Sequence, residues 1–169
     1  AYVPTHPAAA EALSWMGFEA RAAMLALLDE AIADPKAQVR LVAYDLNEPD
    51  VVTRLEKLGP RLKAIVDDSA DHGEDTSAET QATARLIASA GATNVKRQHM
   101  GKLQHNKTIV VNGPKVKAVL CGSTNFSWRA LFVQANHAVI VRGTKVVGAF
   151  SETANLNGID IAGSAGTPV

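Results

Sequence analysis

A histidine and a lysine stand two positions apart at the head of an apolar run. His105 and Lys107 open this run, which continues to residue 111. Side chains alternate between the faces of a strand, so residues two apart lie on the same face. An imidazole and an ammonium on one face can converge on one anion. The pattern therefore predicts a phosphate-handling site with a histidine nucleophile.

A polar turn follows the next apolar run and can close over the same anion. It reads Gly122, Ser123, Thr124, Asn125. The side chains of Ser123 and Asn125 are short hydrogen-bonding groups, and the backbone N–H groups of the turn would add to the phosphate cradle. We expect these two residues to bind the phosphate or to orient the reactive side chains.

The chemistry of this residue set is nucleophilic displacement at phosphorus. A neutral His105 imidazole can attack a phosphodiester and hold the phosphoryl group covalently. Lys107 would bind a non-bridging oxygen and offset the charge of the transition state. The leaving group needs a proton, and neither His99 nor His137 is well placed along the chain to give it. A second copy of the motif across a two-fold axis would supply it, which predicts a homodimer or the second half of a longer chain.

Charge is distributed unevenly although the formal net charge is zero. Residues 1–79 hold 15 acidic and 7 basic residues, whereas residues 80–151 hold 10 basic residues and no Asp or Glu. The motif lies inside this basic stretch, which favours an anionic ligand. The alternative is that the two halves neutralise each other in space.

Length and composition are those of one globular domain. The chain has 169 residues, of which 47% are hydrophobic and 20% charged, enough for one full core. No run is long and apolar enough to span a bilayer. The single cysteine, Cys121, excludes an internal disulfide and is expected as a buried thiol. The chain begins without methionine, as a processed protein or a piece of a longer one would, so its cellular location stays open.

Hydrophobic periodicity and breakers predict a mixed-sheet α-β-α sandwich formed by one domain over residues 1–169. Residues 1–7 and 156–169 are expected as flexible tails. The Asn112–Gly113 pair predicts a β-hairpin between the two runs that carry the motif. Helices are expected over residues 8–33, 47–58, 78–90 and 144–155, and strands over residues 39–44, 62–66, 95–98, 107–111, 116–121 and 138–142, with a short helical or irregular connection over 126–132.

The motif resembles the signature of the phospholipase D superfamily. His105, Lys107 and Asn112, followed by Gly122, Ser123 and Asn125, are similar to the family's HxKx4D and GSxxN elements. The resemblance implies a phospholipase D-like catalytic domain that hydrolyses or transfers phosphodiesters through a phosphohistidine. It also implies no metal or other cofactor, two motifs in each active site, and a phospholipid or nucleic-acid substrate.

Two positions depart from the family pattern. Asn112 stands where the family has Asp, and Asn136 where a Glu often orients the histidine. A straight strand would hold Asn112 roughly 23 Å from His105, and Asn forms turns as well as Asp does. We therefore interpret Asn112 as structural and expect activity to survive. The neutral amide of Asn136 stabilises a cationic ring less than a carboxylate, which predicts reduced catalytic power.

Other readings of the same residues stay open. The basic half can be a binding module for nucleic acid or an anionic lipid head group, with catalysis lost through Asn112 and Asn136. The chain can also be an isolated half of a two-motif enzyme. His99 and His105 could share a metal, although no carboxylate or cysteine stands near them in sequence. Asp45 and Asp67–Asp68 end strands, and we interpret them as loop caps rather than site residues.

Overall fold

The computed structural model describes residues 5–16, 18–99 and 105–153. A six-stranded mixed sheet in the order β3-β2-β1-β4-β5-β6 forms its centre. β1, β2 and β3 run parallel, and β4, β5 and β6 continue the sheet antiparallel to their neighbours. The strands are β1 (Gln38–Ala43), β2 (Leu62–Asp67), β3 (Val95–Gln98), β4 (Thr108–Asn112), β5 (Lys117–Gly122) and β6 (Ala138–Arg142).

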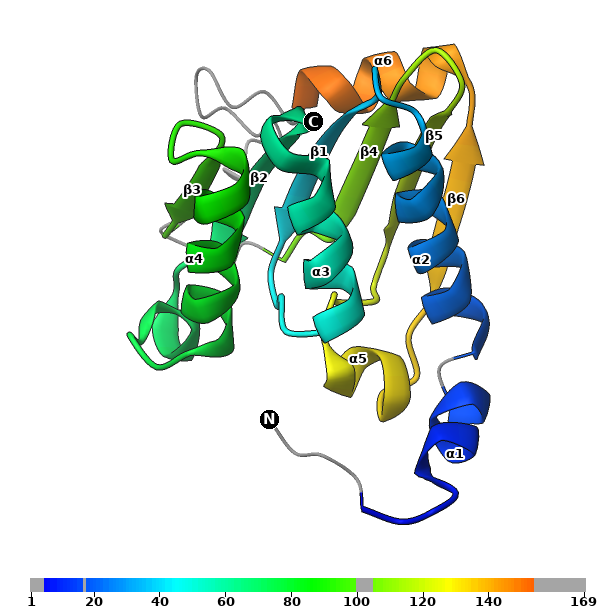
Figure 1. Ribbon diagram of the computed structural model, residues 1–169, viewed down its shortest axis with the longest axis vertical. Helices are drawn as coiled ribbons and strands as arrows, with labels where there is room; N and C mark the ends of the chain where they lie inside the picture. Colours follow the sequence, from blue (N-terminus) through cyan, green and yellow to red (C-terminus); the bar gives the residue numbers. More distant parts are fainter. Residues whose placement is uncertain (1–4, 17, 100–104, 154–169) are drawn as a thin grey trace, which may run out of the picture.

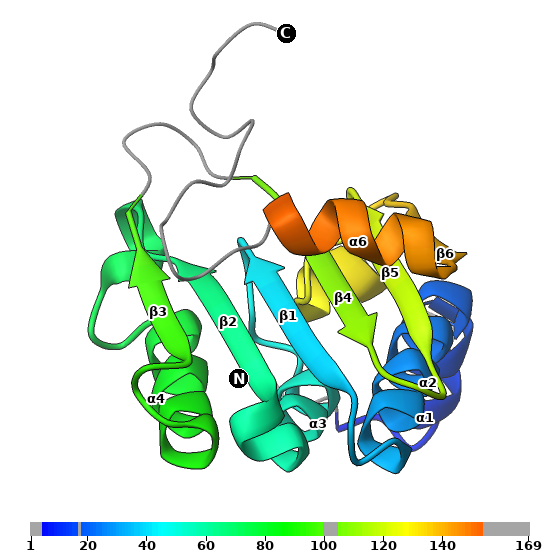
Figure 2. The ribbon, with the colours of Figure 1, turned by 90° about the horizontal axis from the view of Figure 1, so that it is seen from above.

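Helices cover both faces of this sheet, so the predicted α-β-α architecture is confirmed. The six helices in the described part of the chain are α1 (Ala9–Met16), α2 (Phe18–Ala33), α3 (Pro49–Leu58), α4 (Ala78–Ala90), α5 (Trp128–Phe132) and α6 (Thr144–Thr153). Figure 1 shows α2, α3 and α4 side by side along the sheet. Figure 2 shows α6 on the opposite face, where it packs on β4 and β5. No helix among the described residues is long and apolar enough to cross a membrane.

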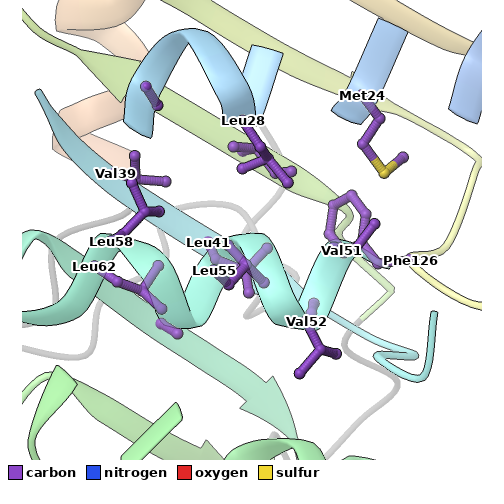
Figure 3. Packing of buried hydrophobic residues seen from close by; sticks show 14 of the residues in the cluster. Met24, Leu28, Val39, Leu41, Val51, Val52, Leu55, Leu58, Leu62 and Phe126 are labelled. Carbon is purple, nitrogen blue, oxygen red and sulfur yellow. The ribbon is translucent and has the colours of Figure 1, made fainter. Parts of the chain in front are cut away.

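The main core lies between the sheet and the helices α2, α3 and α4. Figure 3 shows apolar side chains of α2 and α3 meeting those of β1 and β2. Met24, Leu28 and Leu55 are fully buried, and burial of each such side chain contributes about 2 kcal/mol. Phe126 joins the same cluster from the loop after β5. This anchor holds the loop that carries the polar turn against the sheet.

Local signals in the sequence explain where several helices begin and end. The Glu48 carboxylate accepts a hydrogen bond from the backbone N–H of Val51 and caps α3, with Pro49 in the first turn. The Ser77 hydroxyl caps α4 by accepting from the Thr80 N–H, and Gly91 ends that helix at φ 95°. The bounds of α4, β3 and β6 agree with the expected ranges.

The helix expected over residues 8–33 corresponds to the described helices α1 and α2. Residue 17, between their bounds, lies outside the described residues. The expected strands 107–111 and 116–121 each begin and end one residue later. The expected tail 156–169 and residues 1–4 lie outside the described residues.

A hairpin joins β4 to β5 as the Asn–Gly pair predicts. The Gly113 N–H donates to the Val116 carbonyl at 2.8 Å, and the Lys115 N–H donates to the Asp34 carboxylate at 2.8 Å. A Cβ on Gly113 would lie 2.4 Å from that carboxylate and 2.7 Å from the Ala37 Cβ. Glycine is therefore required here by the close approach of the α2–β1 connection.

Candidate active site

Four strand ends meet at one edge of the sheet and carry the candidate site. The register aligns Val42 of β1 with Thr108 of β4, and Thr108 with Cys121 of β5. The carboxyl ends of β1, β2 and β5 therefore lie at the same edge as the start of β4. Tyr44, which follows β1, contacts both His105 and Lys107, which precede β4.

Tyr44 brings His105 and Lys107 together. The Tyr44 and His105 rings meet edge to face with centroids 4.8 Å apart. The Lys107 ammonium lies 5.0 Å from the centroid of the same Tyr44 ring, a cation–π distance. Lys107 Nζ also donates a hydrogen bond to the His105 carbonyl at 2.5 Å. The two side chains that the sequence pairs thus contact one aromatic ring.

Burial sets the protonation of both groups. Burial, followed by the Lys107 ammonium, lowers the pKa of His105 below its usual value, while Asp45 opposes the shift. The imidazole is therefore neutral at pH 7, the form in which it is a nucleophile. Burial also lowers the pKa of Lys107 to about 8, against the opposing pull of Asp45 and Asp67. Lys107 is only 2% exposed. Because its pKa of about 8 lies above 7, its side chain still carries a proton in most molecules at pH 7.

Asn125 is held at this edge by Asp45. Its Nδ2 donates to Asp45 Oδ2 at 2.8 Å, and the Ser127 hydroxyl donates to the same oxygen at 3.3 Å. A backbone bridge between Leu46 and Phe126 ties the segment after β1 to the segment after β5. The amide of Asn125 is therefore fixed beside the group that acts electrostatically on His105.

Ser123 lies at the same edge but turns toward β6. Its hydroxyl oxygen accepts from the His137 backbone N–H at 3.0 Å and lies 3.1 Å from His137 Nδ1. A cavity of about 640 Å³ lies next to it, lined by Thr124, Asn136 and His137 among others. The side chain of Ser123 thus bonds to His137, which lines this cavity, rather than to His105.

The two Asn positions that depart from the family pattern make hydrogen bonds with residues other than His105. Asn112 ends β4 at the opposite edge of the sheet, where its Oδ1 accepts from Lys117 Nζ at 2.8 Å. Asn136 donates to the Ala130 carbonyl at 3.0 Å and to the Gln134 side chain at 3.3 Å. The contacts of both amides are local, with their own hairpin and their own loop.

Sequence reasoning missed a second group of residues at this edge. From the sequence we interpret Asp45 and Asp67 as loop caps and predict no role for His72. Both carboxylates contact His72. His72 Nε2 lies 3.0 Å from Asp45 Oδ1, and His72 Nδ1 lies 2.8 Å from Asp67 Oδ2. The His72 ring also meets the Tyr44 ring edge to face at 4.5 Å. The signal was their position after β1 and β2, since sites of α/β sheets form at the carboxyl ends of strands.

The basic half of the chain is partly neutralised by the acidic half. Arg85 and Arg142 form bidentate ion pairs with Glu56 and Glu30. Arg97 forms an ion pair with one oxygen of Asp68. The alternative of mutual neutralisation therefore holds for these three arginines, whereas an anionic ligand beside Lys107 stays a prediction. Cys121 is half-buried on the α6 side of the sheet.

A metal shared by His99 and His105 finds no support among the described residues. His99 Nδ1 lies 3.4 Å from the Asp68 carbonyl, at the end of β3. Three other potential metal ligands do lie close together, namely Asp45, His72 and Glu79. Their ligand atoms all lie within 4.8 Å of one another.

Comparison with known proteins shows the family and the fold of the chain. The family model described as "Cardiolipin synthase, PLD-like domain" matches residues 28–155. The structure is similar to that of Nuc from Salmonella typhimurium, a phospholipase D family member, with 25% sequence identity, a TM-score of 0.61, and coverage of 79% of this chain and 82% of that one.

Two further solved structures share the fold. NucT from Helicobacter pylori is 16% identical with a TM-score of 0.57, covering 80% of this chain and 86% of that one. Polyphosphate kinase from Porphyromonas gingivalis is 18% identical with a TM-score of 0.52, covering 76% of this chain but 23% of the kinase. No curated protein matches the sequence.

Proposed function

The chain belongs to the phospholipase D superfamily, and we propose that it is a phosphodiesterase in which His105 forms a phosphohistidine intermediate. The family and the resemblance to Nuc support phosphodiesterase activity in general. One observation carries the finer proposal: His105 and Lys107 both contact the Tyr44 ring. The lowered pKa of His105 favours its neutral form at pH 7, whereas Lys107, with a pKa of about 8, still carries its charge in most molecules.

In the first step, a His105 nitrogen attacks phosphorus and the bond to the leaving oxygen breaks. The Lys107 ammonium binds a non-bridging oxygen and stabilises the charge that spreads over the phosphoryl group. The Asn125 amide lies beside Asp45 and is placed to orient the phosphate or the carboxylate. The leaving oxygen takes a proton from a general acid.

A second copy of the chain is the proposed source of that proton. Of the histidines that the structure describes, His72 is engaged by two carboxylates and His137 contacts Ser123. His105 of a second copy, facing the first across a two-fold axis, would complete the site in those dimers in which one of the two imidazoles carries a proton. In the second step it would take a proton from water, which attacks phosphorus and breaks the P–N bond. No metal takes part in these steps.

Neither departure from the family pattern removes a group that this mechanism uses. Asn112 lies at the far edge of the sheet, where an Asp would be equally remote from the substrate. Asn136 contacts Ala130 and Gln134, so His105 lacks the carboxylate that family members often provide. Asp45, which raises the pKa of His105 against the effect of burial, partly replaces that carboxylate.

The deciding experiment compares two histidine variants. His105→Ala should abolish hydrolysis of bis(p-nitrophenyl) phosphate, whereas His99→Ala, at the end of β3, should retain it. Labelling with a radioactive phosphodiester should give an acid-labile, alkali-stable phosphohistidine in the wild type and none in His105→Ala. Unchanged turnover in His105→Ala would reject the assignment.

Substrate class is tested in parallel. Plasmid DNA, single-stranded DNA and phosphatidylcholine vesicles should be incubated with the protein with and without chelator. Cleavage of DNA with untouched vesicles, or the reverse, assigns the substrate. Size-exclusion chromatography with light scattering should give a dimer in the active preparation, and a purely monomeric active protein would contradict the shared site.

A second candidate function is anion binding without turnover. The observation that favours it is the local bonding of Asn136, which leaves His105 without an orienting carboxylate from the start of β6. In that case binding to DNA or to anionic vesicles would weaken with salt, and a dimeric preparation would hydrolyse none of the substrates.

A further inference from the structure

His72 lies between two carboxylates at the edge of the candidate active site. It belongs to the short 3-10 turn Ala70–Gly73 after β2. Asp67 is 2% exposed, and its carboxylate oxygen Oδ2 lies 2.8 Å from His72 Nδ1. Asp67 also accepts hydrogen bonds from the backbone N–H and the hydroxyl of Ser69, which fix its orientation. His72 therefore donates its Nδ1–H to a rigid carboxylate.

This contact determines what the other ring nitrogen can do. With the proton on Nδ1, the neutral imidazole presents a lone pair at Nε2. That atom lies 3.0 Å from Asp45 Oδ1, which is also an acceptor. Two acceptors at this distance require either a proton or a cation between or beside them. Histidines that bind metals commonly donate their other N–H to a carboxylate in this way.

A third carboxylate completes the group. Glu79, in the first turn of α4, is 5% exposed, and its Oε1 accepts from the Leu46 N–H at 3.1 Å. One oxygen or nitrogen each from Asp45, His72 and Glu79 lies within 4.8 Å of the others. Three different segments of the chain, after β1, after β2 and at the start of α4, converge on this point.

The cluster has more acceptors and more negative charge than its protein partners satisfy. Asp67 Oδ1 and Asn125 Oδ1 are buried without a hydrogen-bond partner, and each belongs to a side chain that contacts the cluster. Three carboxylates, those of Asp45, Asp67 and Glu79, surround one imidazole. Buried carboxylates without matching cations are costly, and a divalent cation removes that cost.

We propose that Asp45, His72 and Glu79 bind one divalent first-row transition-metal cation beside the phosphodiesterase site. One imidazole and two carboxylates form a ligand set that suits Zn²⁺ and Mn²⁺. Ligand atoms at right angles around a cation lie about 3 Å apart when each bond is about 2.1 Å, and the Asp45–His72 separation is 3.0 Å. Asp67 acts as the outer carboxylate that orients His72.

The cation would offset the negative charge that Asp45 and Asp67 place next to the phosphate-binding groups. Those carboxylates act on Tyr44, His105 and Lys107, and an anionic substrate meets the same field. The cation is not the nucleophile, and no bond to it forms or breaks in the phosphohistidine steps. Its charge would reduce the effect of Asp45 on the pKa of His105. The proposal therefore stands or falls independently of the function assigned to His105.

The test is calorimetric titration of chelator-treated, desalted protein with Zn²⁺ and separately with Mn²⁺. We expect saturable binding of one cation per chain and a higher melting temperature in its presence. His72→Gln and Glu79→Gln should each weaken binding at least tenfold. The matched controls are His99→Gln and Glu74→Gln, both exposed residues near the same end of the sheet, which should bind as the wild type does.

Circular dichroism shows whether a variant that binds the cation less tightly is still folded. A glutamine at position 79 can still accept the Leu46 N–H, so Glu79→Gln should keep the wild-type circular dichroism spectrum. His105→Ala should bind the cation with unchanged affinity, which separates this site from the proposed nucleophile. Absence of saturable binding of both cations, or equal binding by folded His72→Gln and Glu79→Gln, would overturn the proposal.

Discussion

The rings of Tyr44 and His105 meet edge to face at a centroid distance of 4.8 Å, while the Lys107 ammonium lies 5.0 Å from the centroid of the same Tyr44 ring. Tyr44 follows β1, and the other two residues precede β4. The antiparallel pairing of these strands places Val42 opposite Thr108, which brings the three side chains together. Tyr44 therefore positions both members of the histidine–lysine pair.

Replacement of the Tyr44 ring should lower the activity more than removal of its hydroxyl. Tyr44→Phe keeps the aromatic face for Lys107 and the ring contact with His105, so we expect kcat/KM for an aryl phosphodiester within about threefold of wild type. Tyr44→Leu should reduce it by about 10- to 100-fold, because the imidazole and the ammonium lose their common support. Equal losses in the two variants would show that the hydroxyl, not the ring, matters.

The activity should have a narrow pH optimum. Below neutrality it should rise with pH as His105 loses its proton, at a pKa lowered by burial and by Lys107. It should fall again as pH passes about 8, where Lys107 loses the proton that binds phosphate oxygen. The measurement is kcat/KM from pH 5 to 10. In Lys107→Arg, whose side chain stays charged, the alkaline fall near pH 8 should disappear.

Lys107→Met should separate stability from activity. The folded pKa of Lys107 is about 8 and its ordinary value is 10.5. The unfolded state therefore holds more protons between these pH values, so the wild type gains stability as pH rises from about 8 to 10.5 and carries the full penalty below 8. The variant removes that penalty. At pH 7 we expect urea unfolding to show a free energy of unfolding higher by about 1 kcal/mol, with turnover lost.

A loss of more than about 1 kcal/mol in Lys107→Met would contradict this prediction, because the contacts of Lys107 with Tyr44 and the His105 carbonyl would then outweigh its desolvation. The same variant should also lose the pH dependence of stability between pH 8 and 10.5.

Gly113→Ala should destabilise the fold through the hairpin. The new Cβ would lie 2.4 Å from the Asp34 carboxylate and 2.9 Å from the Ala37 Cα, so the hairpin and the α2–β1 connection must separate. We expect a loss of about 1 to 3 kcal/mol in chemical denaturation. The matched control is Gly148→Ala in α6, where a Cβ meets nothing within 4 Å. It should stabilise the protein by about 0.5 to 1 kcal/mol.

Asn112→Asp restores the family residue and should change activity by less than about tenfold. Asn112 lies at the edge of the sheet opposite His105 and contacts Lys117, and a carboxylate there acts only weakly on the site through solvent. Steady-state kinetics of the variant decides the point. A thousandfold gain would mean that the residue takes part in catalysis.

Local sequence patterns are sufficient to predict several helices and strands and the His105–Lys107 pair. Alternating and helical apolar patterns reproduce α4, β3 and β6, and the Asn–Gly pair predicts the hairpin between β4 and β5. These signals work because each depends on residues close in the chain. His105 and Lys107 were recognisable for the same reason, since both belong to one short segment and their spacing alone places them together.

The cluster of acidic residues around His72 could not be predicted from local patterns, because its members come together through the packing of the fold. Asp45, Asp67, His72 and Glu79 come from separate segments that meet because β1 lies between β2 and β4 in the sheet. No local pattern specifies that strand order, which results from burial of the helices against one face. The contacts of Ser123 with His137 and of Asn136 with Ala130 were decided in the same way, by how the loop after β5 packs around the buried Phe126.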